Sequence, residues 1–216
     1  MLQAFAYSET NIEYCQGMNY FTGYLLYIYE DEALCYWFLK MLVDKYALKK
    51  LFIKNIPLLH ICFFQMDRLC ATFIPNFLKK CKSLGIHSSI FISNWIMTLL
   101  TSAFQSSNDN KIPPLLLMIW DALLIDGWKG FMKAMLFIIK KLDERIILLP
   151  QDEILKILTC SISEEIFNNN KYLDDFWMQI SKWKIRDTDL GALQEDYEDL
   201  KAKPQDMKEG VQKGDN

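Results

Sequence analysis

The sequence predicts an all-α protein, and three observations support that prediction. Large apolar residues recur at helical spacing, no stretch alternates apolar and polar residues with the period of a strand, and proline and glycine fall where helices start or end. The 216 residues are 51% hydrophobic and 14% aromatic. A chain of this length and composition can bury a sizeable core in one large domain.

The first strong helical pattern follows an acidic run at residues 30–32, where the helix dipole favours negative charge. A second pattern covers residues 58–73, with Pro57 as a plausible entry and Pro75 as a break. The apolar positions of the first pattern are Leu34, Trp37, Phe38, Met41 and Leu42. Each set lies on one face of a helix, so two amphipathic helices are expected here.

Further helices follow with recognisable punctuation. A short helix is expected to end at Gly85, with Ser88 or Ser89 capping the next. Pro113 and Pro114 start another helix, since proline is tolerated in the first turn. The remaining expected features are a polar loop at 105–111, a turn at Asp126-Gly127, helices over 131–142 and after Leu149-Pro150, and a capping box at 161–164.

These patterns divide the chain into a packed part and a polar part. The side chains predicted to be largely buried are Trp37, Phe38, Phe63, Met66, Phe91, Trp95, Trp120, Met135 and Ile139. From Lys184 the apolar content falls. We therefore expect a helical domain over residues 1–183 and a polar, largely disordered tail over 184–216, whose last residues, 201–216, are dispensable.

Composition excludes several classes of function. A net charge of −3 does not favour a nucleic-acid partner. Six cysteines without a CxxC pair, and only two histidines, predict no metal site and reduced thiols in a cytoplasmic protein. The longest uncharged run, 83–108, is too polar for a transmembrane segment. No GxxxxGK[ST] motif is present, so the chain is expected to bind no nucleotide and no cofactor.

Residues 14–20 read YCQGMNY, and this stretch resembles the YxQGMN motif of TBC-domain proteins. That family consists largely of GTPase-activating proteins for Rab GTPases. Further stretches resemble family segments in the family's order: 32–41 (EALCYWFLKM), 74–86 (IPNFLKKCKSLGI), 89–99 (SIFISNWIMTL) and 119–127 (IWDALLIDG). The resemblance covers residues 2–165 and implies an irregular multi-helix TBC-type domain that is incomplete at its N-terminus.

The resemblance implies a catalytic role for Gln16 on a GTP-bound Rab-family GTPase. Hydrolysis of GTP needs an aligned water and donors for the charge on the phosphoryl oxygens. TBC proteins supply a glutamine and an arginine in trans, and Gln16 matches that glutamine. An amide can accept from water and donate to phosphate, while Gly17 leaves room for a close backbone approach. Read alone, Gln16 is a polar residue at a helix start.

Other residues are expected to form or support the partner-binding surface. They are Tyr14, Gly17, Asn19, Ser89, Phe91 and Trp95. Tyr14 and Asn19 are expected to brace the loop, and either could touch the partner. Phe91 and Trp95 are expected to support the groove, since tryptophans and phenylalanines of an aromatic helical protein mostly belong to the core.

The sequence departs from the family pattern in two places. The family's arginine finger lies in an IxxDxxR motif before YxQG, but none of the fifteen residues before Gln16 is an arginine. The first arginine is Arg68, which does not resemble that motif. We therefore expect a fragment, or a protein without the finger, that is inactive alone. Met118 replaces an arginine of the family's RxWD segment, which predicts a difference in partner or rigidity.

Two functions from different classes follow. The first is a GTPase activator that acts in trans in vesicle trafficking and is not itself an enzyme, located in the cytoplasm and peripheral to endomembranes through its GTPase. The second is a finger-less binding module for a small GTPase or another membrane-traffic protein. A generic helical scaffold is a third reading. The presence of IxxDxxR upstream of Met1 separates the first two.

Overall fold

The computed structural model describes residues 1–9, 12, 14–46, 48–104, 112–146, 148–159 and 170–202. The prediction of an all-α fold is confirmed, because no strand occurs within those ranges. The elements are α1 (Leu2–Ser8), α2 (Met18–Tyr29), α3 (Glu32–Lys45), the 3₁₀ turn η1 (Leu48–Leu51), α4 (Pro57–Phe73), α5 (Pro75–Ser83), α6 (Ser89–Met97), the 3₁₀ turn η2 (Thr101–Phe104), α7 (Pro114–Ile146), α8 (Gln151–Thr159), α10 (Asn170–Lys182) and α11 (Asp187–Ala202).

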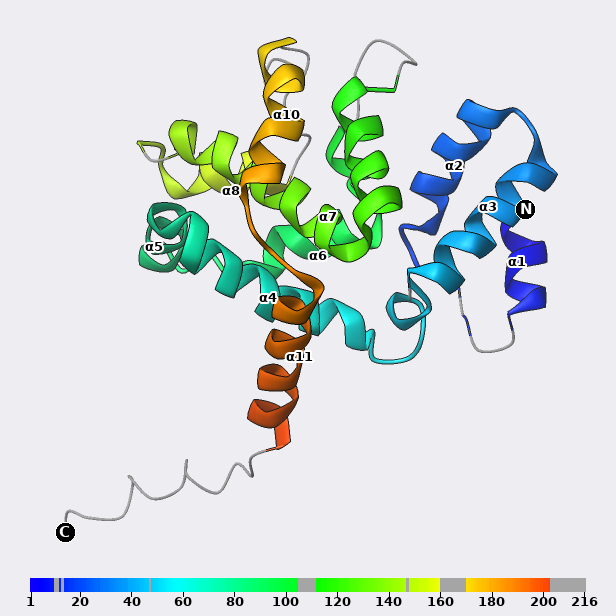
Figure 1. Ribbon diagram of the computed structural model, residues 1–216, viewed down its shortest axis with the longest axis horizontal. Helices are drawn as coiled ribbons and strands as arrows, with labels where there is room; N and C mark the ends of the chain where they lie inside the picture. The colour runs from blue at the N-terminus through cyan, green and yellow to red at the C-terminus, as the bar shows by residue number, and fades with distance from the viewer. Residues whose placement is uncertain are drawn as a thin grey trace.

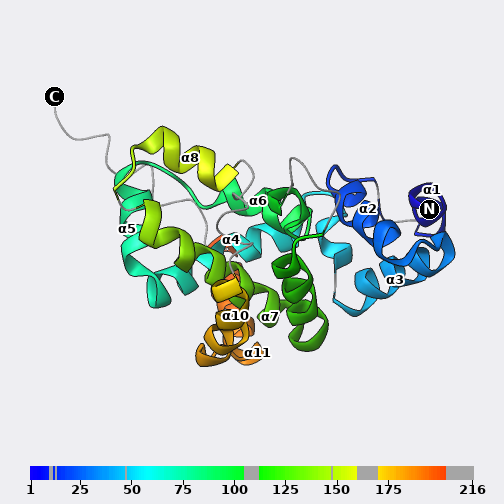
Figure 2. The ribbon, with the colours of Figure 1, turned by 90° about the horizontal axis from the view of Figure 1, so that it is seen from above.

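The helices form an elongated arrangement around α4 and α7. Figures 1 and 2 show α1, α2 and α3 gathered at one end, with α5 and α8 at the other. In between, α4 packs against α5, α6, α7 and η1. Its buried face includes Leu59, Cys62, Met66 and Leu69, which repeat at helical spacing. α4 therefore connects the end that carries the YCQG segment to the rest of the molecule.

α7 is a kinked helix that supplies much of the core. It begins at Pro114, as predicted, and Gly127 interrupts it with a φ of 65° and a ψ of −150°. The helix folds tightly beyond this point, because a Cβ on Gly130 would lie only 2.0 Å from the backbone oxygen of Ala122. Every residue from 131 to 139 is buried. The predicted turn at Asp126-Gly127 is therefore a kink between two helical segments.

Most predicted core residues lie inside, and one does not. Those that are buried are Met66, Phe91, Trp95, Met135 and Ile139, while Phe38, Phe63 and Trp120 are half-buried. The prediction for Trp37 is wrong, since its side chain is 63% exposed. The buried stripe of α3 consists of Cys35, Leu39, Leu42 and Val43. Trp37 lies two positions from both Cys35 and Leu39, which places it on the opposite face of the helix.

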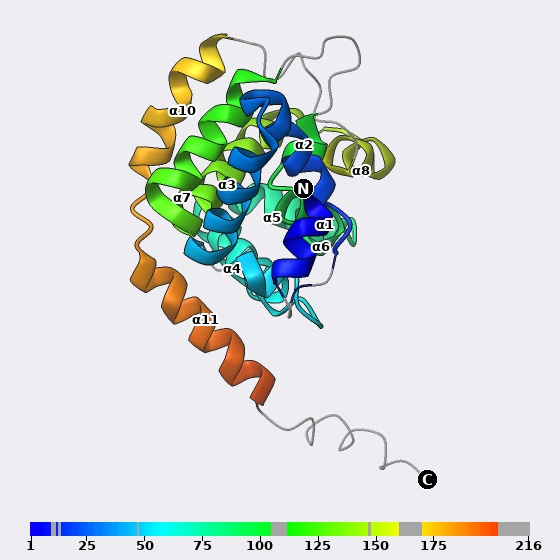
Figure 3. The same cartoon turned by 90° about the vertical axis from the view of Figure 1, so that its right-hand side faces the viewer.

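The segment after Lys184 differs from the expected disordered tail. Ile185 and Leu190 are buried, and α11 packs on α4. The Gln65 side chain donates a hydrogen bond of 2.9 Å to the Leu190 oxygen, which fixes the start of α11. Figure 3 shows the C-terminal end of α11 projecting beyond the other helices.

Some expectations fall outside the described residues. They are the polar loop at 105–111, the capping box at 161–164, and the residues of the predicted tail beyond 202. Their assignments, and the domain boundary at 183, stay predictions. Among the helices described, none is both long and apolar enough to cross a membrane.

Candidate functional site

Gln16 lies on the loop that leads into α2. The residue is exposed, and its side-chain amide has no hydrogen-bond partner among the described residues. Gly17 caps α2 with a φ of 117°, a conformation that favours glycine. The Gln16 amide therefore points into solvent, and the conformation of Gly17 sets the direction of the backbone that carries it. Both the N–H donor and the carbonyl acceptor of this amide can bind a second molecule.

Asn19 braces this loop from within α2. Its side-chain oxygen accepts hydrogen bonds from the Tyr14 hydroxyl at 3.4 Å and from the Gly17 N–H at 3.3 Å. Tyr14 remains 59% exposed. The structure thus gives Tyr14 and Asn19 the bracing geometry expected from the sequence, and it leaves part of the tyrosine ring available for a partner.

The backbone at the end of α6 approaches Gly17 closely. A Cβ on Gly17 would lie 2.9 Å from the Met97 oxygen and 3.4 Å from Cγ2 of Thr98. Contacts under 3.0 Å to a backbone oxygen leave no space for a side chain. The loop is therefore seated directly on the C-terminal end of α6.

That end of α6 is a strained turn. Leu99 and Leu100 have φ values of 48° and 67°, in the left-handed region that costs a residue with a side chain roughly 1–2 kcal/mol. Both leucines are buried, and the Leu100 N–H donates to the Trp95 oxygen at 2.7 Å. Burial and hydrogen bonding keep this conformation in place. Nothing in a Leu-Leu pair signals it in the sequence.

Trp120 reaches this turn from α7. Its indole N–H donates to the Leu99 oxygen at 3.0 Å, and its ring meets the Tyr24 ring of α2 edge-on at 6.4 Å. The half-buried Trp120 thus contacts both elements between which Gly17 lies, α2 and the end of α6.

The other side of the loop is tied down through Glu9. Its carboxylate is buried and pairs with Lys40 of α3 and with Lys49 of η1, the latter at 3.4 Å. The Lys40 hydrogen bond holds the pKa of the Glu9 carboxyl below its ordinary value. The Ile12 N–H donates to the backbone oxygen of Glu9 at 3.0 Å. Sequence reasoning missed Glu9, since nothing distinguishes it from the other acidic residues.

The remaining predicted site residues lie along α6. Ser89 begins the helix, and its hydroxyl lies 2.8 Å from His87 Nδ1. Met97 is at the other end of α6, about 12 Å of helix away from Ser89. Phe91 and Trp95 are buried and pack edge-on at 5.2 Å. The structure brings Tyr14, Gly17 and Asn19 to Gln16, whereas Phe91 and Trp95 offer no exposed surface and serve α6 as core residues.

Two of the three arginines make contacts on or near α11. The Arg68 guanidinium lies 4.9 Å from the centre of the Phe64 ring, and that ring contacts Tyr197 of α11 at 5.8 Å. Arg186 pairs with Asp189 at 2.9 Å. Arg145 is exposed in the last turn of α7. The contacts of Arg68 and Arg186 are made with residues outside the loop of Gln16.

Four of the described cysteines, Cys35, Cys62, Cys70 and Cys81, are buried in the core. Burial raises the pKa of Cys62 and Cys70 well above the ordinary range, and that of Cys81 to about 11. These thiols therefore stay protonated at neutral pH. No group of histidine, cysteine and acidic residues that could hold a metal ion occurs in the described part of the chain.

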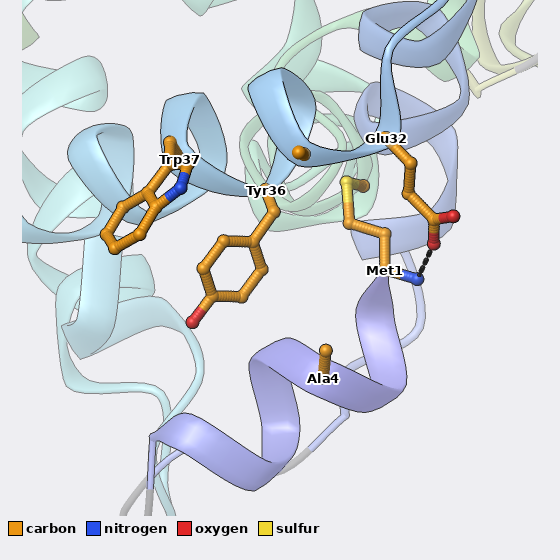
Figure 4. A pocket seen from close by; sticks show the side chains of 6 residues that line it. Met1, Ala4, Glu32, Tyr36 and Trp37 are labelled. Atoms are coloured by element: carbon orange, nitrogen blue, oxygen red, sulfur yellow. Dashed lines mark hydrogen bonds and ion pairs between the residues drawn. The ribbon is translucent and has the colours of Figure 1, made fainter.

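A separate open cavity of about 420 Å³ lies between α1 and α3. Figure 4 shows Met1 and Ala4 on one side, with Tyr36 and Trp37 on the other. The terminal ammonium of Met1 pairs with Glu32 at its edge. The cavity brings together apolar walls and one carboxylate, so it offers a surface for packing and no catalytic constellation.

The family assignment agrees with this geometry. A family model of the Rab-GTPase-TBC domain matches residues 1–147, which include α1 to α7 and the Gln16 loop. The chain belongs to this family. The matched residues are therefore part of a TBC domain, and the resemblance drawn from YCQGMNY is confirmed.

Curated relatives are similar over most of the chain. GTPase-activating protein GYP5 of Saccharomyces cerevisiae is 26% identical over 168 residues, 78% of this chain and 18% of the relative. Rab GTPase-activating protein eat-17 of Caenorhabditis elegans is 24% identical over 165 residues, 76% of this chain and 18% of the relative. TBC1 domain family member 2A of Rattus norvegicus is 26% identical over 147 residues, 68% and 15% of the two chains. The matches thus span less than a fifth of these relatives.

Proposed function

We propose that this TBC domain acts on a GTP-bound Rab-family GTPase and supplies Gln16 to its active site. The observation that carries the proposal is the exposed Gln16 amide on a loop seated on α6 and braced by Asn19. A group that acts in trans must be presented to solvent in a defined orientation, because positioning supplies much of the rate in phosphoryl transfer.

The proposed chemistry takes place on the partner. The Gln16 carbonyl oxygen accepts from the attacking water and its amide N–H donates toward the phosphoryl oxygens. The bond that breaks belongs to the partner's GTP, so the chain is an activator and has no substrate or cofactor of its own. Association with a membrane follows from that of the GTPase.

The second component of such a site is an arginine, worth about 10³–10⁵ in rate, or roughly 4–7 kcal/mol of barrier. The fifteen residues before Gln16 contain none, and lysine lacks the planar fork of guanidinium. A second candidate function is that the chain binds a GTPase without stimulating it. On either proposal, this chain alone accelerates GTP hydrolysis by no more than a few-fold.

Affinity for two nucleotide states tests the proposal. The chain is titrated against a Rab panel loaded with a non-hydrolysable GTP analogue, and against the same GTPases loaded with GDP and aluminium fluoride, which mimics the transition state. An activator site prefers the transition-state mimic, and Gln16→Ala abolishes that preference. Gln3→Ala, an exposed glutamine of α1, is the matched control. Equal affinity for both states indicates a binding module, and binding to no GTPase overturns both proposals.

A further inference from the structure

The end of α6 receives a hydrogen bond that is unusual in its placement. The indole N–H of Trp120, on the first segment of α7, donates to the backbone oxygen of Leu99 at 3.0 Å. Leu99 and Leu100 are the two consecutive left-handed residues of the strained turn. A side-chain donor from another helix thus holds the carbonyl of a backbone that would otherwise relax toward negative φ.

The strained turn lies next to the Gln16 loop. Leu99 follows Met97 by two residues, and the Met97 oxygen lies 2.9 Å from the position that a Cβ on Gly17 would take. A shift of the Leu99 carbonyl therefore moves Met97 and Thr98 relative to Gly17, at a contact too close to admit a side chain on Gly17. Gln16 precedes Gly17 directly, so the shift changes the direction in which its amide leaves the loop.

Trp120 also contacts the helix that follows Gly17. Its ring meets Tyr24 of α2 edge-on at 6.4 Å with an interplanar angle of 75°, and α2 begins immediately after Gly17. One side chain therefore fixes the relation between the helix that follows Gln16 and the turn on which the loop is seated.

We propose that Trp120 is a positioning residue for Gln16. Its N–H locks the Leu99–Leu100 turn, and this turn holds Gly17 and thereby the Gln16 amide in the orientation that a partner meets. The positioning itself is a property of the free chain, and its consequence for GTP hydrolysis rests on the function proposed above.

The chain contains a matched control for this bond. Trp128, eight residues further along α7, is also half-buried, and its indole N–H donates to the Tyr46 oxygen at 2.7 Å. Trp120→Phe and Trp128→Phe each remove one indole donor to one backbone carbonyl. Only the first of these carbonyls belongs to the turn beneath Gly17.

Hydrogen–deuterium exchange of the full chain without a partner provides the first readout. Trp120→Phe is expected to raise exchange of the amides at residues 15–18 by roughly three- to tenfold, the factor that one lost hydrogen bond represents. Trp128→Phe is expected to leave these amides unchanged. Equal exchange at 15–18 in both variants overturns the proposal.

A second variant removes the donor without changing the volume of the ring. Benzothienylalanine at position 120 replaces the indole N–H by sulfur and is expected to reproduce the exchange increase at 15–18, while the melting temperature stays close to that of the parent. If it leaves exchange unchanged, the hydrogen bond does not position the loop, even where Trp120→Phe fails to fold.

Affinity separates this inference from the proposed function. Trp120→Phe is expected to lower affinity for the GTPase with GDP and aluminium fluoride by about tenfold or more, as expected when a reacting group is displaced, with less effect on the GTP-analogue form. An equal loss for both forms contradicts positioning. If the parent chain binds neither form, the proposed function fails while the exchange result still decides the role of Trp120.

Discussion

α7 lies in a region that is packed very differently from the region of α1 to α3. Around its second segment, every residue from 131 to 139 is buried, and the Phe137 ring meets Phe176 of α10 edge-on at 5.2 Å. Around α1 to α3, large side chains lie in solvent, with Tyr7 93%, Trp37 63% and Tyr27 53% exposed. The first region is a closed core, and the second is a set of helices with uncovered faces.

The Gln16 loop lies where these regions meet. On the side of the core, the loop packs on the end of α6, whose Trp95 is buried. On the side of α1 to α3, Glu9 and Asn19 hold the loop. A catalytic loop placed on a rigid element keeps its geometry better than one held only by other loops. The contrast predicts that changes on the α6 side affect site geometry, whereas changes on the outer face of α3 do not.

The largest expected effect contrasts the two regions directly. Phe137→Ala removes a fully buried ring from the core, so it should lower the free energy of unfolding by about 3–5 kcal/mol. Trp37→Ala removes a larger but exposed side chain and should stay within about 0.5 kcal/mol. Urea unfolding monitored by circular dichroism measures both. A loss of several kcal/mol at Trp37 would mean that α3 is covered in solution.

The position of Trp37 also shows how far periodicity alone can predict burial. The apolar stripe predicted for α3 included Trp37 and left out Cys35. Because neighbouring faces of this helix both carry large side chains, spacing alone did not show which face is buried. Packing against α2 chose the face of Cys35 and Leu39. Likewise, α11 was missed because two apolar residues, Ile185 and Leu190, dock an otherwise polar segment. Helix positions followed from proline, glycine and spacing, whereas the contacting face depended on neighbours.

The second effect concerns catalysis. In a longer form of the polypeptide that carries an IxxDxxR segment ahead of residue 1, GTP hydrolysis on the cognate GTPase should be restored. Gln16→Ala in that form should lower kcat by about 10²-fold, on the scale of one transition-state hydrogen-bonding group. Affinity should change much less, since one amide is a small part of an interface.

Single-turnover hydrolysis at saturating activator measures this effect, with Gln3→Ala as the control. If the Gln16→Ala variant turns over like the wild type, Gln16 has no catalytic role and is a polar residue at a helix start. Strong activity of the 216-residue chain without any added segment would contradict the expected need for an arginine.

Gly17→Ala should have the third largest effect. The new Cβ would meet the Met97 oxygen at 2.9 Å and would place alanine at a φ of 117°, so a destabilisation of about 1–3 kcal/mol is expected. Gly23→Ala is the matched control on α2, because nothing lies within 4 Å of its Cβ. That variant should stabilise the helix by roughly 0.5–1 kcal/mol. Opposite signs in thermal unfolding would sharpen the contrast, and equal signs would refute it.

Gly17 and Glu9 mark what the sequence could and could not predict about the site. The motif named Gln16, Gly17 and Asn19, and local contacts among these residues follow from their spacing. The element beneath Gly17 could not be predicted, because a left-handed Leu99-Leu100 pair has no sequence signal. Nor could the pairing of Glu9 with Lys40, since the two lie thirty-one residues apart and meet only through the packing of α1 on α3.

The smallest expected effect is the pH dependence of the Glu9 pair. Lys40 and Lys49 lower the pKa of the folded-state Glu9 carboxyl from the ordinary value of 4.5. A lowered folded-state pKa means that the unfolded chain binds the proton more tightly. The stability contributed by Glu9 is therefore complete above pH 4.5 and is lost as the pH falls through the lower, folded-state value. Glu9→Gln should remove that contribution at neutral pH and flatten the acid limb of the stability curve.

Urea midpoints measured from pH 7 to pH 3 test this, with Glu195→Gln on exposed α11 as the control. Because both lysines are partly exposed, about 0.15 M salt should screen much of the effect. The pair should still matter locally, since Ile12 is bonded to the Glu9 backbone and leads into the loop. If Glu9→Gln and Glu195→Gln give parallel curves, the Glu9 pair does not secure the outer side of the Gln16 loop, and Asn19 and the contact with α6 hold it instead.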